Sequence, residues 1–304
     1  MRDDDRPNAR DDGVRTLYRY MSFPPSVDSS EIANAVRQRA DALVSFGELY
    51  FARAEQLNDP FEASPHLYTP RTGDGLPDFE SLCATLRRVY APRWQWSEDR
   101  IRAAEAQLKS KIDRGTFDAD MALIAEKWGA MFRKDYPMCC FAKDGDNIPM
   151  WSYYATGHAG VCVHFDATRA PIANALRVSY GDNYPELAMP MGEIRPGEVI
   201  KYCLLTKSSA WSHEKEYRLI NMPTYAGDTI TARILDGLLR WPEGPQLAFV
   251  PARFIVGVTL GAQMESAHVE HFARICRDRV PPLPVFQART HRSRYALQIE
   301  LERG

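Results

Sequence analysis

The sequence has 304 residues, enough for one large domain or two smaller ones around a substantial core, so stapling by metals or disulfides is not required. Hydrophobic residues make up 45% and charged residues 26%, a composition that excludes a disordered or fibrous chain. No apolar run approaches the roughly 18 residues of a membrane-spanning helix, and the net charge of −2 excludes an overall positive field for nucleic acid. We therefore expect no membrane partner. The overall charge gives no strong global signal for binding nucleic acid, although a local basic groove is compatible with these numbers.

The cysteines and the first residues indicate a cytoplasmic protein. The six cysteines include no C-x-x-C pair, and Cys139 and Cys140 are adjacent, which suits neither a zinc site nor a secreted disulfide framework. The charged N-terminus is followed by no apolar segment and therefore does not resemble a signal peptide. We expect residues 1–15 to form a mobile, disordered tail.

Hydrophobic spacing predicts an α+β fold with strands separated by irregular spacers. Strands are expected at residues 17–20, 49–52, 138–141, 161–165, 176–180, 215–221, 254–260, 283–288 and 295–301. Helices are expected at residues 30–42, 79–91, 97–112, 118–136, 150–154, 204–210, 230–239 and 266–277. Because the long helices gather between two strand-rich parts, we predict one domain over residues 16–304, with a mixed or antiparallel central sheet, flanking helices and a helical insert at 70–137.

A short acidic segment predicts a further helix start. Asp59 is a suitable N-cap, Pro60 fits the first helical position, and Glu62 lies where a capping box places a carboxylate. This structural explanation suffices for the segment unless other observations add a function.

Several familiar catalytic motifs are absent from the sequence. There is no glycine-rich phosphate loop and no nucleophile elbow. His213-Glu214 lacks the second histidine of a zinc-protease helix, and His268 and His271 lack a third ligand. We therefore predict no metal site.

The segment 207–220, K-S-S-A-W-S-H-E-K-E-Y-R-L-I, is the most informative stretch of the sequence. In an extended strand, Glu214, Glu216 and Arg218 lie on one face because strand side chains alternate. Adjacent carboxylates repel, so the pKa of one rises unless a cation neutralises the pair, and this is a common way to tune catalytic acids. The alternative is a solvated edge strand with a Glu–Arg ladder.

A second constellation lies in residues 150–165. Trp151 and Tyr154 fall on one helical segment, and such rings can stack on a planar ligand while their polar tips orient it. Ser152 and His158 are the polar residues here that would face a cleft. The alternative is that Trp151 is a core residue.

The third constellation is Tyr18-Arg19-Tyr20. An arginine flanked by tyrosines is suited to bidentate binding of a phosphate. The alternative is a surface arginine that packs on aromatic rings.

In this order, these segments resemble a bacterial family catalogued as domain of unknown function 2971. The resemblance spans residues 17–301 apart from the helical insert, and its motifs add Asn58, Asp59, Lys207 and Trp211 to the candidate substrate-binding residues. The motifs are L-Y-R-Y at 17–20, L-Y-F at 49–51, N-D-P-F-E at 58–62, C-F at 140–141, M-W-S-Y-Y at 150–154, G-H-A-G-V-C-V-H-F-D at 157–166, K-S-S-A-W-S-H-E-K-E-Y-R at 207–218 and I-V-G-V-T-L-G at 255–261.

A more distant likeness connects the sequence to ADP-ribosyltransferases of the arginine-serine-glutamate type. Arg19, Ser152 and the triplet Glu214-Lys215-Glu216 occur in the order that these enzymes show. The likeness implies an enzyme that transfers ADP-ribose from NAD to an unknown macromolecular acceptor. NAD would be a co-substrate rather than a tightly bound cofactor.

The same likeness implies individual roles. Arg19 would hold the NAD phosphates, and Ser152 would support the scaffold near the nicotinamide. Glu216 would accept a hydrogen bond from the ribose 2′-hydroxyl and stabilise the oxocarbenium charge, while Glu214 would position the acceptor. Tyr154 or Tyr20 would stack on the nicotinamide ring.

Two other hypotheses remain open at this point. A non-catalytic sensor would use the aromatic helix and Arg218 to bind a nucleotide or another anion. A metal-dependent nuclease would place Asp59, Glu62 and Glu216 around Mg²⁺, because hard cations prefer carboxylate ligands.

Overall fold

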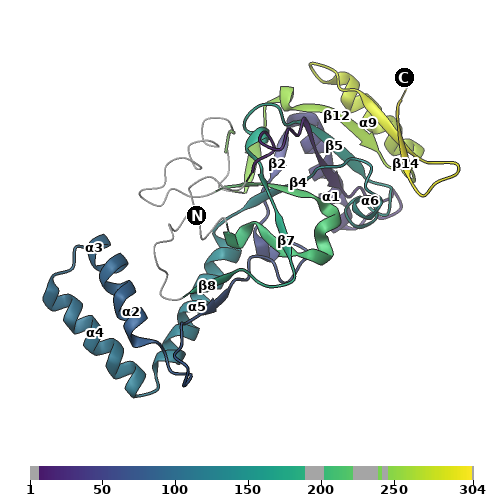
Figure 1. Ribbon diagram of the computed structural model, residues 1–304. Coiled ribbons are helices and arrows are strands. Elements are labelled where there is room, and N and C mark those ends of the chain that lie inside the picture. Colours follow the sequence, from purple (N-terminus) through teal and green to yellow (C-terminus); the bar gives the residue numbers. More distant parts are fainter. Residues whose placement is uncertain (1–6, 189–201, 222–238, 242–245, 303–304) are drawn as a thin grey trace.

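An eight-stranded sheet forms the centre of the molecule (Figure 1). The computed structural model describes residues 7–188, 202–221, 239–241 and 246–302. The strand order is β14-β13-β12-β5-β1-β4-β10-β6, and within it only β12 and β13 run parallel. The predicted α+β class with a mixed central sheet is therefore confirmed. The strands are β1 (Thr16–Met21), β4 (Met138–Ala142), β5 (Val161–Asp166), β6 (Leu176–Arg177), β10 (Glu216–Ile220), β12 (Ile255–Leu260), β13 (Val285–Thr290) and β14 (Leu297–Leu301).

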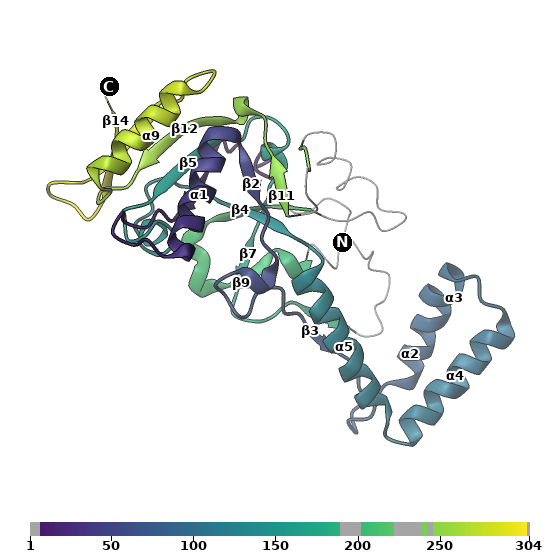
Figure 2. The same cartoon turned by 180° about the vertical axis from the view of Figure 1, so that it is seen from behind.

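Two helices, α1 (Glu31–Phe46) and α9 (Ser266–Asp278), cover one face of the sheet (Figure 2). Their buried side chains, such as Leu43 and Phe272, pack against Leu17 of β1 and other inward-facing strand residues in the main core. Helix α1 begins where the Ser30 hydroxyl accepts a hydrogen bond from a backbone N–H and ends at Gly47, whose φ of 74° favours glycine.

Helix α6 (Ile148–Tyr154) packs on the opposite face of the sheet. Its buried Met150 and Trp151 contact a smaller apolar cluster that includes Tyr20 of β1 and Cys162 of β5. Since side chains alternate along a strand, Tyr20 faces α6 while Leu17 faces the main core. This second face carries the candidate site described below.

The helical insert contains α2 (Phe79–Thr85), a π-helical turn η2 (Leu86–Tyr90), α3 (Ala91–Arg93), α4 (Glu98–Asp113) and α5 (Phe117–Lys134). Helices α2 to α4 project away from the sheet, and we call residues 79–113 the helical arm (Figure 1). Helix α5 leads back to the body, where Phe132 and Trp128 pack with residues of a third apolar cluster.

Shorter elements complete the structure around the sheet. They pair as β2 (Glu48–Tyr50) with β11 (Leu247–Phe249), β3 (His66–Tyr68) with β8 (Glu186–Ala188), and β7 (Ser179–Gly181) with β9 (Thr206–Ser208). Short 3₁₀ helices are η1 (Ala54–Gln56), η3 (Ile172–Asn174), η4 (Ser209–Glu214) and η5 (Ala252–Phe254). None of the helices in the described ranges combines the length and hydrophobicity needed to cross a bilayer.

Three sequence predictions need correction. The helix predicted over 204–210 is wrong, because Thr206–Ser208 form β9 beside β7 and tertiary pairing overrides local spacing. The helix predicted to start at Asp59 is instead a turn, closed by hydrogen bonds from the Phe61 and Glu62 amides to Asp59. The helix predicted over 230–239 lies, up to residue 238, outside the described residues.

The N-terminal segment also differs from the expected mobile tail. From residue 7 onward it packs on the domain, because Ala9 is buried and donates its N–H to the Ala175 carbonyl. The Tyr217 hydroxyl donates to the Asp12 carboxylate at 2.6 Å. The segment 7–15 is therefore part of the folded domain.

Close backbone approach at two glycines gives a first prediction. Gly261 donates its N–H to the Gly160 carbonyl, and a Cβ at Gly261 would lie 2.1 Å from the His158 oxygen. We expect Gly261→Ala to lower the free energy of unfolding by about 1–3 kcal/mol, because backbone must move to admit the methyl group. Urea denaturation measures the change. Gly73→Ala is the matched control, since nothing lies within 4 Å of that position, and equal effects of the two variants would contradict the prediction.

Candidate functional site

The candidate site is a cavity of about 230 Å³ on the face of the sheet that α6 covers. Strands β1, β4 and β10 contribute its floor, and α6 and the segments at 56–58 and 207–214 contribute its walls. The lining residues with polar or aromatic side chains are Tyr18, Arg19, Tyr20, Gln56, Asn58, Cys140, Phe141, Tyr154, Lys207, Glu214 and Glu216. Positions far apart in the sequence therefore meet in one cavity.

Arg218 lies behind the cavity at the centre of a buried ionic cluster. Its side chain is fully buried and binds both Glu216 oxygens, with Nε donating at 2.8 Å and Nη2 at 2.9 Å. Its Nη1 donates to Glu62 at 2.6 Å and to the Leu204 carbonyl at 2.5 Å. The bidentate contact fixes the orientation of the Glu216 carboxylate.

Lys207 completes the cluster from β9. Its ammonium group donates to Glu214 at 2.6 Å and to Glu216 at 3.5 Å, and it lies 3.9 Å from Glu62. Only 7% of its side chain is exposed, so these contacts are weakly screened by water. We call the set Glu62, Lys207, Glu214, Glu216 and Arg218 the ionic cluster.

The predicted common face of Glu214, Glu216 and Arg218 is produced by a different local structure. Strand β10 begins only at Glu216, whereas Glu214 ends the 3₁₀ turn η4. Lys215 between them adopts a left-handed conformation with φ of 45°. The resulting bend still brings both carboxylates to Lys207, so the cavity has two acidic groups side by side.

Electrostatics separate the pKa values of the two carboxyls. Burial alone would raise the pKa of Glu216, but the Arg218 guanidinium and the Lys207 ammonium outweigh it and lower the pKa to about 2. Burial raises the pKa of Glu214, and the neighbouring Glu216 charge raises it further. Glu216 is thus held ionised, while Glu214 is the group able to exchange a proton.

Tyr154 links α6 to this acidic pair. Its hydroxyl donates to Glu214 at 2.6 Å, and burial together with that hydrogen bond raises the pKa of Tyr154. The ring lines the cavity together with those of Tyr18 and Tyr20 from β1. The cavity therefore combines aromatic rings with charged groups.

Arg19 lies where β1 and β4 separate. These strands pair at a single register position, Tyr18 with Ala142. Beyond it, Arg19 Nη1 donates to the Cys140 carbonyl at 3.0 Å and contacts the Cys139 sulfur, and Nη2 donates to the Tyr50 carbonyl at 3.2 Å. Three of its five N–H groups are thereby used, which leaves two donors on a guanidinium that lines the cavity.

Other predicted site residues do not line the cavity. Trp151 is a core residue with no exposed surface, and its Nε1 donates to the Gly145 carbonyl. Ser152 is exposed on α6 and donates back to the Ile148 carbonyl of its own helix, because it lies one residue round the helix from the buried face. The proposed placement of Trp151 and Ser152 beside a ligand is therefore not supported.

His158, Asp59 and Trp211 also lie outside the cavity lining. His158 stacks on the outer side of Trp151 with ring centroids 6.4 Å apart. Asp59 is buried and holds the turn described above. Trp211 contacts the Lys207 ammonium, whose nitrogen lies 4.9 Å from the ring centroid, and so acts on the site through Lys207.

Three contributors to the site were not among the residues predicted from the sequence to act on or bind a substrate. The Glu216 amide donates to the Tyr180 hydroxyl at 2.9 Å, and Cys140 lines the cavity next to Glu216. Glu62 was interpreted as a helix-capping residue, but it pairs with Arg218. Glu62 in N-D-P-F-E and Cys140 in C-F gave a sequence signal through the motifs of the family resemblance, whereas Tyr180 lies in none of those motifs.

The predicted metal-dependent nuclease site is not assembled. Arg218 occupies the space between Glu62 and Glu216, and Asp59 bonds its own turn. Among the described residues no group of three or more histidine, cysteine or acidic side chains is arranged to hold a metal ion.

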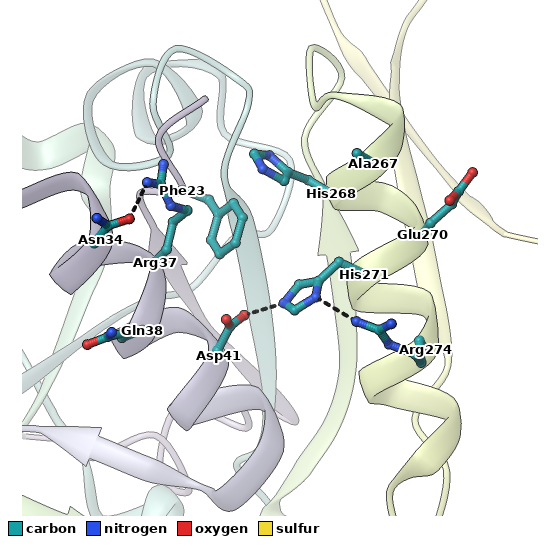
Figure 3. Close-up of a pocket in the computed structure, with 10 residues that line it drawn as sticks. All are labelled: Phe23, Asn34, Arg37, Gln38, Asp41, Ala267, His268, Glu270, His271 and Arg274. Carbon is teal, nitrogen blue, oxygen red and sulfur yellow. Dashed lines mark hydrogen bonds and ion pairs between the residues drawn. The ribbon is translucent and has the colours of Figure 1, made fainter. Parts of the chain in front are cut away.

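A second cleft of about 480 Å³ lies between α1 and α9 (Figure 3). His271 lies 2.8 Å from the Asp41 carboxylate and accepts a hydrogen bond from Arg274, while His268 lies 2.9 Å from the Ser26 hydroxyl. The contact between His271 and Asp41 joins the two helices, and the one between His268 and Ser26 joins α9 to the segment before α1. The candidate site remains the cavity beside Glu216, because the sequence motifs converge there.

Comparisons with protein-family models, with curated proteins and with solved structures found no match. The family resemblance of the sequence thus rests on its motifs alone. The chemistry of the site is argued below from its own geometry.

The burial of Arg218 gives a second prediction. We expect Arg218→Met to lower the free energy of unfolding by about 3–5 kcal/mol, because two buried carboxylates lose their partner. The exposed Arg289, which pairs with Glu300 on the surface, provides the matched control Arg289→Met, with an effect below about 1 kcal/mol. Urea denaturation of both variants measures this. Similar losses would show that Arg218 is not the centre of the cluster.

The two carboxyls give a third prediction, because their effects on stability have opposite pH dependence. The lowered pKa of Glu216 stabilises the fold above its ordinary value of 4.5, by about 3 kcal/mol, and this contribution is lost as the pH falls toward about 2. The raised pKa of Glu214 instead costs stability as the pH rises above its ordinary value.

Thermal unfolding between pH 3 and pH 8 tests these signs. We expect Glu216→Gln to lower Tm at neutral pH and to flatten the loss of stability in acid. Glu214→Gln should lower Tm less at neutral pH. It should also remove the loss of stability that the ionisation of Glu214 causes as the pH rises above 4.5. A larger loss at neutral pH for Glu214→Gln than for Glu216→Gln would reverse the assignment.

Proposed function

We propose that the protein is an enzyme that transfers ADP-ribose from NAD to an acceptor, with the cavity beside Glu216 as its active site. The observation that carries the proposal is the pair Glu214 and Glu216, held in one ring-lined cavity with pKa values displaced in opposite directions. Paired carboxyls with separated pKa values are suited to cleavage of glycosidic bonds, where one stays charged and the other handles a proton.

Glu216 is suited to stabilise the transition state. When the bond between nicotinamide and ribose breaks, its electron pair leaves with the nicotinamide nitrogen and positive charge develops on the ribose ring. An ionised carboxylate fixed by Arg218 needs no reorganisation to face that charge. The contact from Lys207 to Glu216 is long, at 3.5 Å, and a ribose 2′-hydroxyl would take its place as a donor to that carboxylate oxygen.

Glu214 is suited to position and deprotonate the acceptor. The acceptor nucleophile bonds to the ribose carbon that nicotinamide leaves, and its proton passes to the Glu214 carboxylate. The raised pKa of Glu214 makes it a better proton acceptor than an ordinary carboxylate once ionised. Tyr154 and Lys207 hold its two oxygens in place.

The remaining walls fit the rest of the donor. A tyrosine ring of the cavity, Tyr154 or Tyr20, is placed to stack on nicotinamide. Within the described part of the chain, the hydrogen-bond partners of Arg19 include no carboxylate, so its charge is available to the phosphates. The volume of about 230 Å³ is below the range of about 300–1,000 Å³ for sites that enclose a whole ligand, so one end of the dinucleotide enters.

A second candidate function is a non-catalytic nucleotide or anion sensor. It is favoured by the pairing of every carboxylate in the ionic cluster with a cation, which also suits a purely structural role. In that case Arg19 would be the ligand-binding group. The two functions differ in whether nicotinamide is released.

The fourth prediction concerns turnover. Incubated with NAD, alone or with a cell extract as the acceptor source, the protein should release nicotinamide, detected by chromatography. Glu216→Gln should reduce the rate by about 10²-fold or more, because the charge that stabilises the transition state is removed. Glu300→Gln, on the exposed strand β14, is the control and should leave the rate unchanged.

Two adjacent tyrosines provide a matched pair that preserves the cluster. Tyr154→Phe removes the hydroxyl that Glu214 accepts from, whereas Tyr153 is 65% exposed on the other side of α6. We expect Tyr154→Phe to slow nicotinamide release and Tyr153→Phe to leave it unchanged. Absence of turnover in the parent protein, with an NAD-dependent rise in Tm that Glu216→Gln retains, would replace the enzyme with the sensor.

A further inference from the structure

The far end of the helical arm is basic, although the chain as a whole is acidic. Residues 86–102, which we call the arm tip, contain five arginines against one glutamate and one aspartate, a formal charge of +3. The net charge of the whole chain is −2, so the rest of the sequence carries −5. The arm tip is therefore a local basic region that the net charge of the whole chain does not reveal.

The arm tip also presents aromatic rings between its arginines. Trp94 ends α3 and is 62% exposed. Gln95, which follows it, has a positive φ of 53°, and this turn separates α3 from α4. Trp96 comes next, and the Arg100 guanidinium lies over its ring, 5.0 Å from the centroid. A large exposed indole on a projecting element indicates a contact surface.

The arm contributes little to the core of the domain. Of its described side chains, only Leu82, Ala91 and Ile101 belong to the buried apolar set. Arg87 binds Glu98 and Glu105 and so holds the arm helices to one another. Figures 1 and 2 show the helices of the arm projecting away from the sheet, so the arm tip lies apart from the packed body of the domain.

We propose that the arm tip binds single-stranded nucleic acid, with Trp94 stacking on an unpaired base and Arg100 contacting a phosphate. Alternating rings and guanidinium groups match a strand that offers a base and a phosphate at every step. A duplex hides the faces of its bases, so an indole gains less from it. An acidic protein would match the charge but supplies no regular series of planar rings.

The assignment of residues follows from their contacts. Arg87 binds two glutamates and Arg102 binds Asp99, whereas the Arg100 guanidinium lies over the Trp96 ring, so Arg100 is the arginine that we assign to phosphate. Its contact with Trp96 keeps that guanidinium beside the indole surface. This inference is independent of the proposed transferase activity, since it concerns a different part of the molecule and is measured by binding.

The fifth prediction tests binding with the full-length protein. Fluorescence anisotropy is measured with labelled thymidine and uridine homopolymers of about 16 nucleotides and with a duplex of equal length. We expect the single strands to bind more tightly than the duplex at low salt. Trp94→Ala should weaken single-strand binding about tenfold, because one stacking contact is lost, and Trp94→Phe should retain most of the affinity.

The salt dependence of binding distinguishes the contribution of Arg100 from that of the Trp94 ring. Arg100→Gln should weaken binding and reduce the slope of log affinity against log salt by about 0.7, the value for one phosphate contact on a single strand. Trp94→Ala should leave that slope unchanged. Tyr295→Ala and Arg292→Gln are matched controls, because both residues are exposed in the loop between β13 and β14.

Four outcomes would overturn the proposal. They are no single-strand binding at low salt, equal affinity of Trp94→Ala and Tyr295→Ala, tighter binding of the duplex, and an unchanged salt slope for Arg100→Gln. Circular dichroism of each variant confirms that its helices remain folded. Direct binding of a purified acidic protein that Trp94→Ala abolishes, without nucleic-acid binding, would assign the arm tip to a protein partner instead.

Discussion

The bidentate contact between Arg218 and Glu216 is the interaction on which the candidate site depends. A guanidinium with no exposed surface is costly to bury unless carboxylates surround it, and Glu216 and Glu62 supply them from two distant segments. Once Arg218 is held, it lowers the pKa of Glu216 and leaves Glu214, across Lys207, with a raised pKa. The stability of the site and the proposed chemistry therefore both depend on the same buried ionic cluster.

The separation of β1 from β4 gives this cluster a cavity to face. Since the two strands pair only at Tyr18 and Ala142, the backbone of Cys140 is open to Arg19 instead of to a neighbouring strand. Arg19, Lys207 and the two carboxylates line the cavity together with tyrosine rings. This combination of charges and rings suits the proposed ligand, which joins a planar ring, a sugar and phosphates.

The packed body of the domain and the helical arm differ in the properties of their surfaces. The sheet with α1, α6 and α9 forms the packed body around the cavity, whereas the tip of the helical arm carries the exposed Trp94 and a positive charge. Because the arm adds few residues to the core, its sequence is free to serve contacts with another molecule. Binding at the arm and reaction in the cavity are separable by substitutions at Trp94 and Glu216.

The sequence by itself determined the α+β class, most strands of the sheet and the pairing of Glu216 with Arg218, because alternation along a strand is a local property. It also indicated Arg19, Tyr154 and the acidic pair as one group. Only the tertiary structure decided that Trp151 is core, that Ser152 faces outward and that residues 204–210 contain a strand. Those outcomes depend on packing and pairing between segments far apart in the chain, and local spacing carries no information about such contacts.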